Sequence, residues 1–162
     1  MITYQFGQQD FRPVRTLSAT VIAKGDLLYL DTGTGTAKPA NSFTWTTDLA
    51  TTRANFAAVF LGIAASGKAA GSTDDVTVDL SPLSVFAANC ILHTFEIGDM
   101  VTPAQDGSNN LLSSNAVERT TTAAQAIGRV HRYVAHADAL VKVHFGSAYA
   151  AGSSNKNSFF GL

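Results

Sequence analysis

The stretch from Gly62 to Lys68 has the residue types, and nearly the spacing, of a phosphate-binding loop. Such a loop reads Gly-x-x-x-x-Gly-Lys-Ser/Thr: backbone N–H groups surround phosphates at a helix start, and the hydroxyl binds Mg²⁺. Gly67 and Lys68 match this pattern, but Ala69 stands where the hydroxyl is needed. The following residues, AGSTDDVTVDL, predict a turn and a strand rather than a helix. We therefore expect a polar hairpin loop here and no bound nucleotide.

Histidine and cysteine side chains offer the next candidate chemistry. His131 and His136 lie near Asp138 in the sequence, but their spacing is not that of the usual ligand pairs on a strand or helix. Exposed histidines on strands and loops are the simpler interpretation. The single cysteine, Cys90, excludes an internal disulfide, and its apolar neighbours are typical of a small buried side chain. The sequence therefore predicts no metal and no cofactor.

Asp26 and Asp99 could suggest the paired carboxylates of a glycosidase. Each follows a glycine, however, and the Gly-Asp pair is more typical of a turn in which the carboxylate bonds neighbouring backbone N–H groups. No Gly-x-Ser-x-Gly nucleophile elbow occurs, and the glycines at 33–35 lack the rest of a dinucleotide fingerprint. The sequence predicts that the chain is not an enzyme.

Short segments with β periodicity must position these residues. The segment 17–37 predicts two strands around a tight turn at 24–26. In 76–80 and 141–145 apolar and polar residues alternate strictly. Many short strands separated by glycine, aspartate and asparagine turns predict an all-β fold, a small barrel or sandwich.

One segment has a different pattern and predicts a single short helix at about 48–58. Asp48 is a suitable N-cap, and Leu49, Phe56 and Phe60 follow at roughly helical spacing. We expect the two phenylalanines to anchor this helix in the core.

Several short sequences recur in the second part of the chain. The recurrences predict two related halves within one domain, at about 16–80 and 90–146; the alternative is chance recurrence of a common turn pattern. The matched pairs are Gly25-Asp26-Leu27-Leu28 with Gly98-Asp99-Met100-Val101, Leu61-Gly62-Ile63-Ala64 with Ile127-Gly128-Arg129-Val130, and Val76-Thr77-Val78 with Val141-Lys142-Val143, at offsets of 73, 66 and 65 residues.

Composition narrows the classes of partner. The chain has 162 residues, 46% of them hydrophobic and only 14% charged, with a net charge of −1. Such a weak charge gives no footprint for nucleic acid or an anionic membrane, and no apolar run is long enough to span a bilayer. The first residues do not resemble a signal peptide, so we expect synthesis in a cytoplasm.

The two ends of the chain carry aromatic residues among polar or small ones. We expect an N-terminal arm at 1–15, a single β-rich domain at 16–146 and a flexible C-terminal arm at 147–162. Exposed aromatic side chains predict arms that dock on a neighbouring subunit, although a tail folded back on its own domain is the alternative. The candidate partner-binding residues are Tyr4, Phe6, Phe11, Phe159, Phe160 and Leu162.

Taken together, the segments GDLLYLDT, DLATTRANFAAVFLGIA, DVTVDL and GDMV…AIGRV resemble the capsid decoration (cement) proteins of tailed bacteriophages, and the chain looks like their head-stabilising type. The resemblance covers about residues 15–146. It implies a structural virion protein that binds as a homotrimer on the outer capsid surface, at threefold and quasi-threefold positions. There it would clamp adjacent subunits of the major capsid protein and stabilise the capsid.

A non-catalytic binding module of a phage fibre or cell-surface assembly, for example one that binds carbohydrate, is the alternative function. Such a binding module would need a cluster of exposed aromatic side chains. Trp45 is the only tryptophan, in NSFTWTTD beside Phe43. It could equally anchor the loop at 38–48 on the core.

Overall fold

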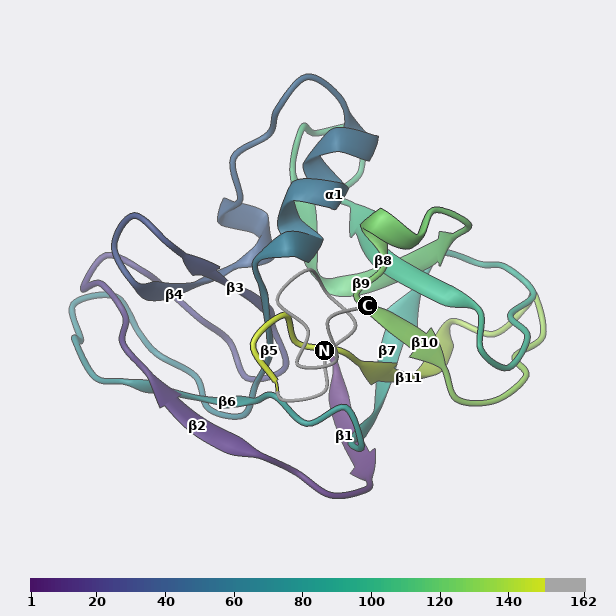
Figure 1. Cartoon of the computed structure of the whole chain (residues 1–162), viewed down its shortest axis with the longest axis horizontal. Coiled ribbons are helices and arrows are strands. Elements are labelled where there is room, and N and C mark those ends of the chain that lie inside the picture. Colours follow the sequence, from purple (N-terminus) through teal and green to yellow (C-terminus); the bar gives the residue numbers. More distant parts are fainter. Residues whose placement is uncertain (151–162) are drawn as a thin grey trace.

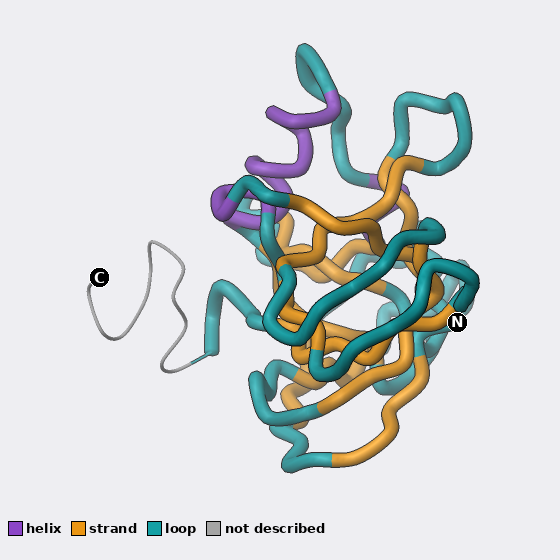
Figure 2. The backbone as a smooth tube through the Cα atoms, turned by 90° about the vertical axis from the view of Figure 1, so that its right-hand side faces the viewer, coloured by secondary structure: helices purple, strands orange, loops and turns teal. Residues whose placement is uncertain are grey.

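The structure is a computed structural model that describes residues 1–150, and its body is made of two β-sheets with helix α1 at one end (Figures 1 and 2). The expected all-β fold is confirmed. One sheet contains, in spatial order, β2 (Phe11–Val14), β6 (Val76–Asp79), β5 (Phe60–Ala64), β3 (Leu27–Asp31) and β4 (Thr36–Pro39). The other contains β1 (Thr3–Phe6), β7 (Val85–Cys90), β11 (Leu140–Phe145), β10 (Gly128–Val130), β8 (Met100–Gln105) and β9 (Leu112–Thr120).

The two halves of the chain have the same topology. Strands β2 to β6 form unit 1, residues 11–80, and strands β7 to β11 form unit 2, residues 85–145. In each unit the spatial order is first, fifth, fourth, second and third strand along the chain. Figure 1 shows the two units side by side, with α1 above their junction. The described part of the chain therefore contains the same five-stranded arrangement twice.

Each unit brings its first and third strands together, which curls the sheet on itself. In unit 2, β7 and β9 pair in parallel, with Asn89 opposite Ala116, and this pairing closes a small barrel. In unit 1 the corresponding contact is one hydrogen bond, in which the N–H of Ala37 donates to the carbonyl of Arg15 at 2.8 Å. Closure leaves fewer unpaired edge groups in both units.

The recurring Gly-Asp sequences form the same turn before the second strand of each unit. The Asp26 carboxylate accepts from the N–H three residues earlier at 2.8 Å, and the Asp99 carboxylate does so at 3.0 Å. Gly25 and Gly98, which precede them, have φ angles of 90° and 84°. Glycine adopts these angles without strain from a Cβ atom, which explains why both residues are glycine.

Strand register and burial also match between the units. Leu28 pairs with Gly62 in unit 1, as Val101 pairs with Gly128 in unit 2. The sequence positions whose side chains face the interior are therefore the same in both units. The buried side chains of unit 1 are Ile22, Leu28, Ala37, Leu61, Ala64, Val76, Val78 and Leu80, and their counterparts in unit 2 are Phe95, Val101, Val117, Ile127, Val130, Val141, Val143 and Phe145.

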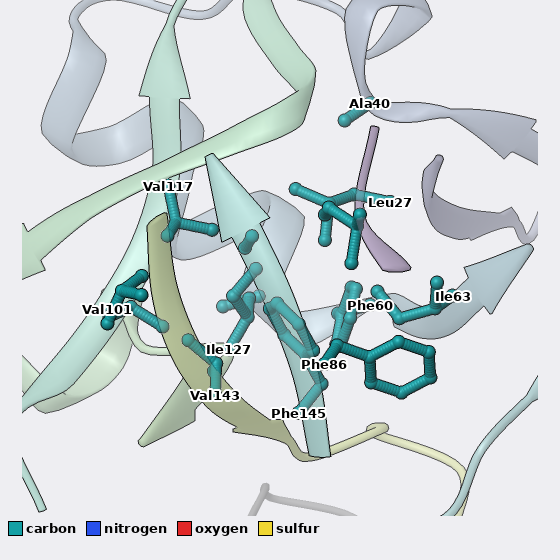
Figure 3. Close-up of a cluster of buried hydrophobic side chains, with 14 of the residues drawn as sticks. Leu27, Ala40, Phe60, Ile63, Phe86, Val101, Val117, Ile127, Val143 and Phe145 are labelled. Carbon is teal, nitrogen blue, oxygen red and sulfur yellow. The ribbon is translucent and has the colours of Figure 1, made fainter. Parts of the chain in front are cut away.

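A row of aromatic rings joins the two units (Figure 3). The ring centroid of Phe60, on β5, lies 6.1 Å from that of Phe145, on β11. Phe56 and Phe86 extend the row on either side, at 5.8 Å from Phe60 and 6.0 Å from Phe145. Phe56 and Phe60 are fully buried. The sheet of unit 1 has an outer face, which points away from the interior of unit 1. The ring contacts join this outer face to the interior of unit 2.

Helix α1 (Leu49–Ala58) lies between β4 and β5, close to the predicted range. Its start is set by Asp48, whose side chain accepts a hydrogen bond from the N–H of Thr51 at 2.7 Å. Phe56 anchors the helix as predicted, whereas Phe60 belongs to β5. In unit 2 the corresponding connection holds only a 3₁₀ turn, Ala123–Gln125. The helix is therefore an addition to unit 1.

The N-terminal residues, which the sequence indicated to be an extended arm at 1–15, are instead part of both sheets. Strand β1 pairs with β7 through Thr3 and Ala87, and β2 pairs with β6 through Phe11 and Asp79. Strand β9 pairs with β7 only from Asn89 onward, so it does not cover the part of β7 that lies beside β1. The backbone groups of this edge need partners, which β1 supplies.

A buried carboxylate fixes the two connections that enter and leave unit 1. Asp79 is 3% exposed and accepts hydrogen bonds from the backbone N–H groups of Asp10 at 3.1 Å and Ser81 at 2.9 Å. The side chains of Gln9 and Ser84 donate to it at 3.2 and 2.8 Å. This network holds the β1–β2 connection against the link between the units.

After β11, residues 147–150 return to unit 1. The N–H of Ala148 donates to the carbonyl of Phe60 at 2.8 Å, and Ala150 packs with the interior cluster of unit 1. These first residues of the expected C-terminal arm therefore pack on unit 1. The rest of that arm, including Phe159, Phe160 and Leu162, lies outside the described residues.

We predict that replacing Phe60 by alanine lowers the free energy of unfolding by about 3–5 kcal/mol, because it opens a cavity where the two units meet. Urea unfolding followed by circular dichroism measures the change. The matched control is Phe11→Ala, since Phe11 is 53% exposed and should cost much less. Equal losses in the two variants would contradict the structural role given to Phe60.

Candidate functional site

The lysine of the phosphate-loop-like sequence is committed to its own fold. Lys68 lies in the hairpin loop between β5 and β6, as predicted, and is 7% exposed. Its Nζ donates to the carbonyls of Leu17 at 2.8 Å and Thr20 at 2.6 Å, with those of Ser18 and Ala69 at 3.4 Å. The ammonium group therefore fastens the β2–β3 loop.

We predict that Lys68→Met lowers the free energy of unfolding by about 1–3 kcal/mol, because the carbonyls lose a charged donor. Lys24→Met, at an exposed lysine, is the control and should change it little. Chemical denaturation measures both variants. In the same protein MgATP should leave the melting temperature unchanged, and a saturable rise that Lys68→Met abolishes would overturn this interpretation.

The structure brings together a histidine pair that the sequence did not indicate. His131 Nδ1 lies 2.8 Å from His144 Nε2, because β10 and β11 are antiparallel. The Phe6 ring lies 5.3 Å from the His131 ring, and Lys142 Nζ lies 5.6 Å from the Phe6 centroid. Within residues 1–150 no three His, Cys, Asp or Glu side chains are grouped to hold a metal ion. The contact with Phe6 places the histidine pair beside strand β1.

Burial lowers the pKa of His144, and the neighbouring His131 lowers it further. The unfolded chain therefore binds more protons than the folded one between the lowered value and the ordinary value of about 6.5. We predict that stability is full above pH 6.5 and declines as the pH falls below about 6.5.

The measurement is the melting temperature between about pH 7.5 and 5.5, compared with that of His144→Gln. The variant should lose less stability on acidification than the unchanged protein. His93→Gln, at an exposed histidine, is the control and should follow the unchanged protein. Identical pH profiles for all three proteins would refute the assignment to His144.

Cys90 is half-buried on β7, and its thiol donates weakly to the Asp138 carbonyl at 3.5 Å. Burial raises the pKa of the Cys90 thiol, and the charge of Asp138 raises it further. A raised pKa keeps the thiol protonated at neutral pH, which makes it a poor nucleophile.

The predicted partner-binding residues of the N-terminal segment are exposed but are not on one strand. Tyr4 and Phe6 lie on β1, 38% and 45% exposed, whereas Phe11 lies on β2 in the other sheet. The Tyr4 ring packs on Phe86 at 5.9 Å. Each of these three residues takes part in a ring contact or in strand pairing, and each still leaves part of its side chain exposed.

A second group of exposed apolar side chains lies in the β7–β8 and β10–β11 loops and at the start of β11, at the right-hand end of Figure 1. These loops are joined by backbone pairing between Phe95 and Val134. We call the group the apolar end of unit 2. It comprises Ile91, Leu92, Ile97, Tyr133 and Leu140, which are 50–75% exposed.

Comparison with unit 1 shows that the fold does not require this apolar end. The same positions in unit 1, taken from the sequence offsets, all carry smaller or more polar side chains. They are Ser18, Ala19, Lys24, Gly67 and Asp75. Sequence reasoning missed the group because its members are scattered among turn residues.

No family model matches this chain, and no curated protein is significantly similar to it. Within residues 1–150, no helix has the length and apolar character needed to cross a membrane. The structure by itself therefore defines the fold class, which is an all-β protein built from two repeated units.

Proposed function

We propose that this chain is a structural virion protein that decorates and stabilises a bacteriophage capsid, bound as a homotrimer across adjacent subunits of the major capsid protein. The observation that carries the proposal is the apolar end of unit 2, which the repeated fold does not need. The sequence resemblance to capsid decoration proteins supplies the partner and the location on the outer capsid surface.

The apolar end has the energetic capacity for a durable contact. Burying one large apolar side chain contributes about 1.5–3 kcal/mol, and five such side chains are available. Tyr133 is of the type enriched at interface hot spots. Because three copies in a trimer would act together, modest contacts would give firm attachment to a repeating surface.

The exposed aromatic residues Tyr4, Phe6 and Phe11 are proposed as further contacts with the capsid or within the trimer. So are Phe159, Phe160 and Leu162, which lie outside the described residues. Two features support a structural role for the scaffold itself. Both units curl so that their first and third strands meet, and Pro13 on β2 limits further strand pairing at that edge.

We predict that Ile97→Asp weakens retention on undecorated heads of the encoding phage by about tenfold or more, because a charge would be buried in the contact. Lys24→Asp is the matched control, since Lys24 occupies the same position in unit 1. Both variants should melt close to the unchanged protein, because both side chains are exposed.

Retention is measured by co-sedimentation with heads, and oligomeric state by analytical ultracentrifugation. A monomer that is also absent from purified virions would overturn the proposal. Equal retention of the Ile97→Asp and Lys24→Asp proteins would remove the apolar end from the contact.

A further inference from the structure

A groove of about 350 Å³ lies in unit 1, between the β3–β4 hairpin and helix α1. It is separate from the apolar end, which belongs to unit 2. Its lining combines polar groups with an apolar floor. The lining includes Tyr29, Asp31, Lys38, Phe43, Asn55 and Val59.

An ion pair supplies one donor and one acceptor to the groove. Lys38 Nζ lies 2.5 Å from an Asp31 carboxylate oxygen, and each side chain is 26% exposed. The hydrogen bond from Lys38 lowers the pKa of Asp31, and the same bond raises the pKa of Lys38. Both groups therefore stay charged at neutral pH, and the pair carries no net charge.

Other lining groups have hydrogen-bonding capacity to spare. The Asn55 carboxamide and the hydroxyls of Thr32 and Thr44 have no hydrogen-bond partner within the described residues, and all three side chains are exposed. A carboxamide both donates and accepts. A ligand rich in hydroxyl groups would find partners of both kinds here.

The apolar part of the groove is held in a fixed orientation. The Phe43 ring packs edge-to-face on Tyr29 at 4.9 Å and on Phe56 at 5.4 Å. The Tyr29 hydroxyl donates to the Ser42 carbonyl at 3.3 Å. Because these rings are braced, the half-buried Phe43 offers a preformed apolar surface beside the ion pair.

The corresponding surface of unit 2 is already occupied. Arg53 of α1 reaches across it, with Nε donating to the Pro103 carbonyl at 2.9 Å and a terminal nitrogen 2.7 Å from Glu118. Strand register makes Glu118 the counterpart of Lys38, since they pair with Thr102 and Tyr29 respectively. In unit 2, therefore, Arg53 from the helix of unit 1 fills the position that unit 1 leaves open.

We propose that the groove of unit 1 binds a neutral saccharide. Sugar hydroxyls would donate to Asp31 and accept from Lys38 and Asn55, and the apolar face of the sugar ring would lie against Phe43. An anionic ligand fits less well, because Asp31 already neutralises Lys38. This inference goes beyond the proposed capsid role and does not depend on it.

The test uses the full ¹⁵N-labelled chain, titrated separately with glucose, galactose and N-acetylglucosamine. At least one sugar should give saturable amide shifts confined to residues 30–32, 42–44 and 55. Asn55→Ala should weaken the binding by about tenfold, because it removes a hydrogen-bonding group. Asn109→Ala, at an exposed asparagine in the β8–β9 loop, is the matched control and should bind unchanged.

Three results would overturn the proposal: no saturable shift in the groove with any of the sugars, shifts that survive Asn55→Ala, or shifts with inorganic phosphate alone. Because Asn55 is exposed, the variant should fold, and its amide spectrum verifies this. Ile97→Asp should bind sugar normally, so failure of the capsid proposal and failure of this one are distinguishable.

Discussion

The packing of Phe60 against Phe145 is the contact on which the rest of the structure depends. Each unit encloses only a small core, and units of this size are marginal as separate domains. The aromatic row joins the interior of unit 2 to the outer face of the unit 1 sheet, and helix α1 adds Phe56 to it. With the buried Asp79 network, this contact orients the two units and the surfaces they carry.

Duplication of one topology explains much of the surface, because each unit serves as a reference for the other. Where the copies agree, as in the Gly-Asp turns and the interior positions, the fold sets the residue. Where they differ, the fold leaves the choice open. Lys24 and Ile97 occupy the same position with opposite character. Lys38 and Glu118 likewise differ, and only Glu118 forms an ion pair with Arg53. These differences locate both proposed contacts.

The units differ most in how their outer sheet faces are used. Leu27 and Ile63, on the outer face of the unit 1 sheet, are buried in the joint core. Of their counterparts in unit 2, Met100 is half-buried and Arg129 is exposed. At these two positions the outer face of the unit 2 sheet is therefore accessible, whereas that of unit 1 is covered.

The sequence alone determined the features that depend on neighbours along the chain. Strand alternation predicted the all-β fold, Asp48 predicted the start of the helix, and the Gly-Asp pairs predicted equivalent turns, because each requires contacts within a few residues. The tertiary structure decided the rest. The His131–His144 pair, the contact of Arg53 with unit 2, the incorporation of β1 and the groove beside Lys38 all depend on how separate strands and the helix come together. Residue type and local spacing do not encode those contacts, because closure of each unit and burial of the aromatic row set them through the whole chain.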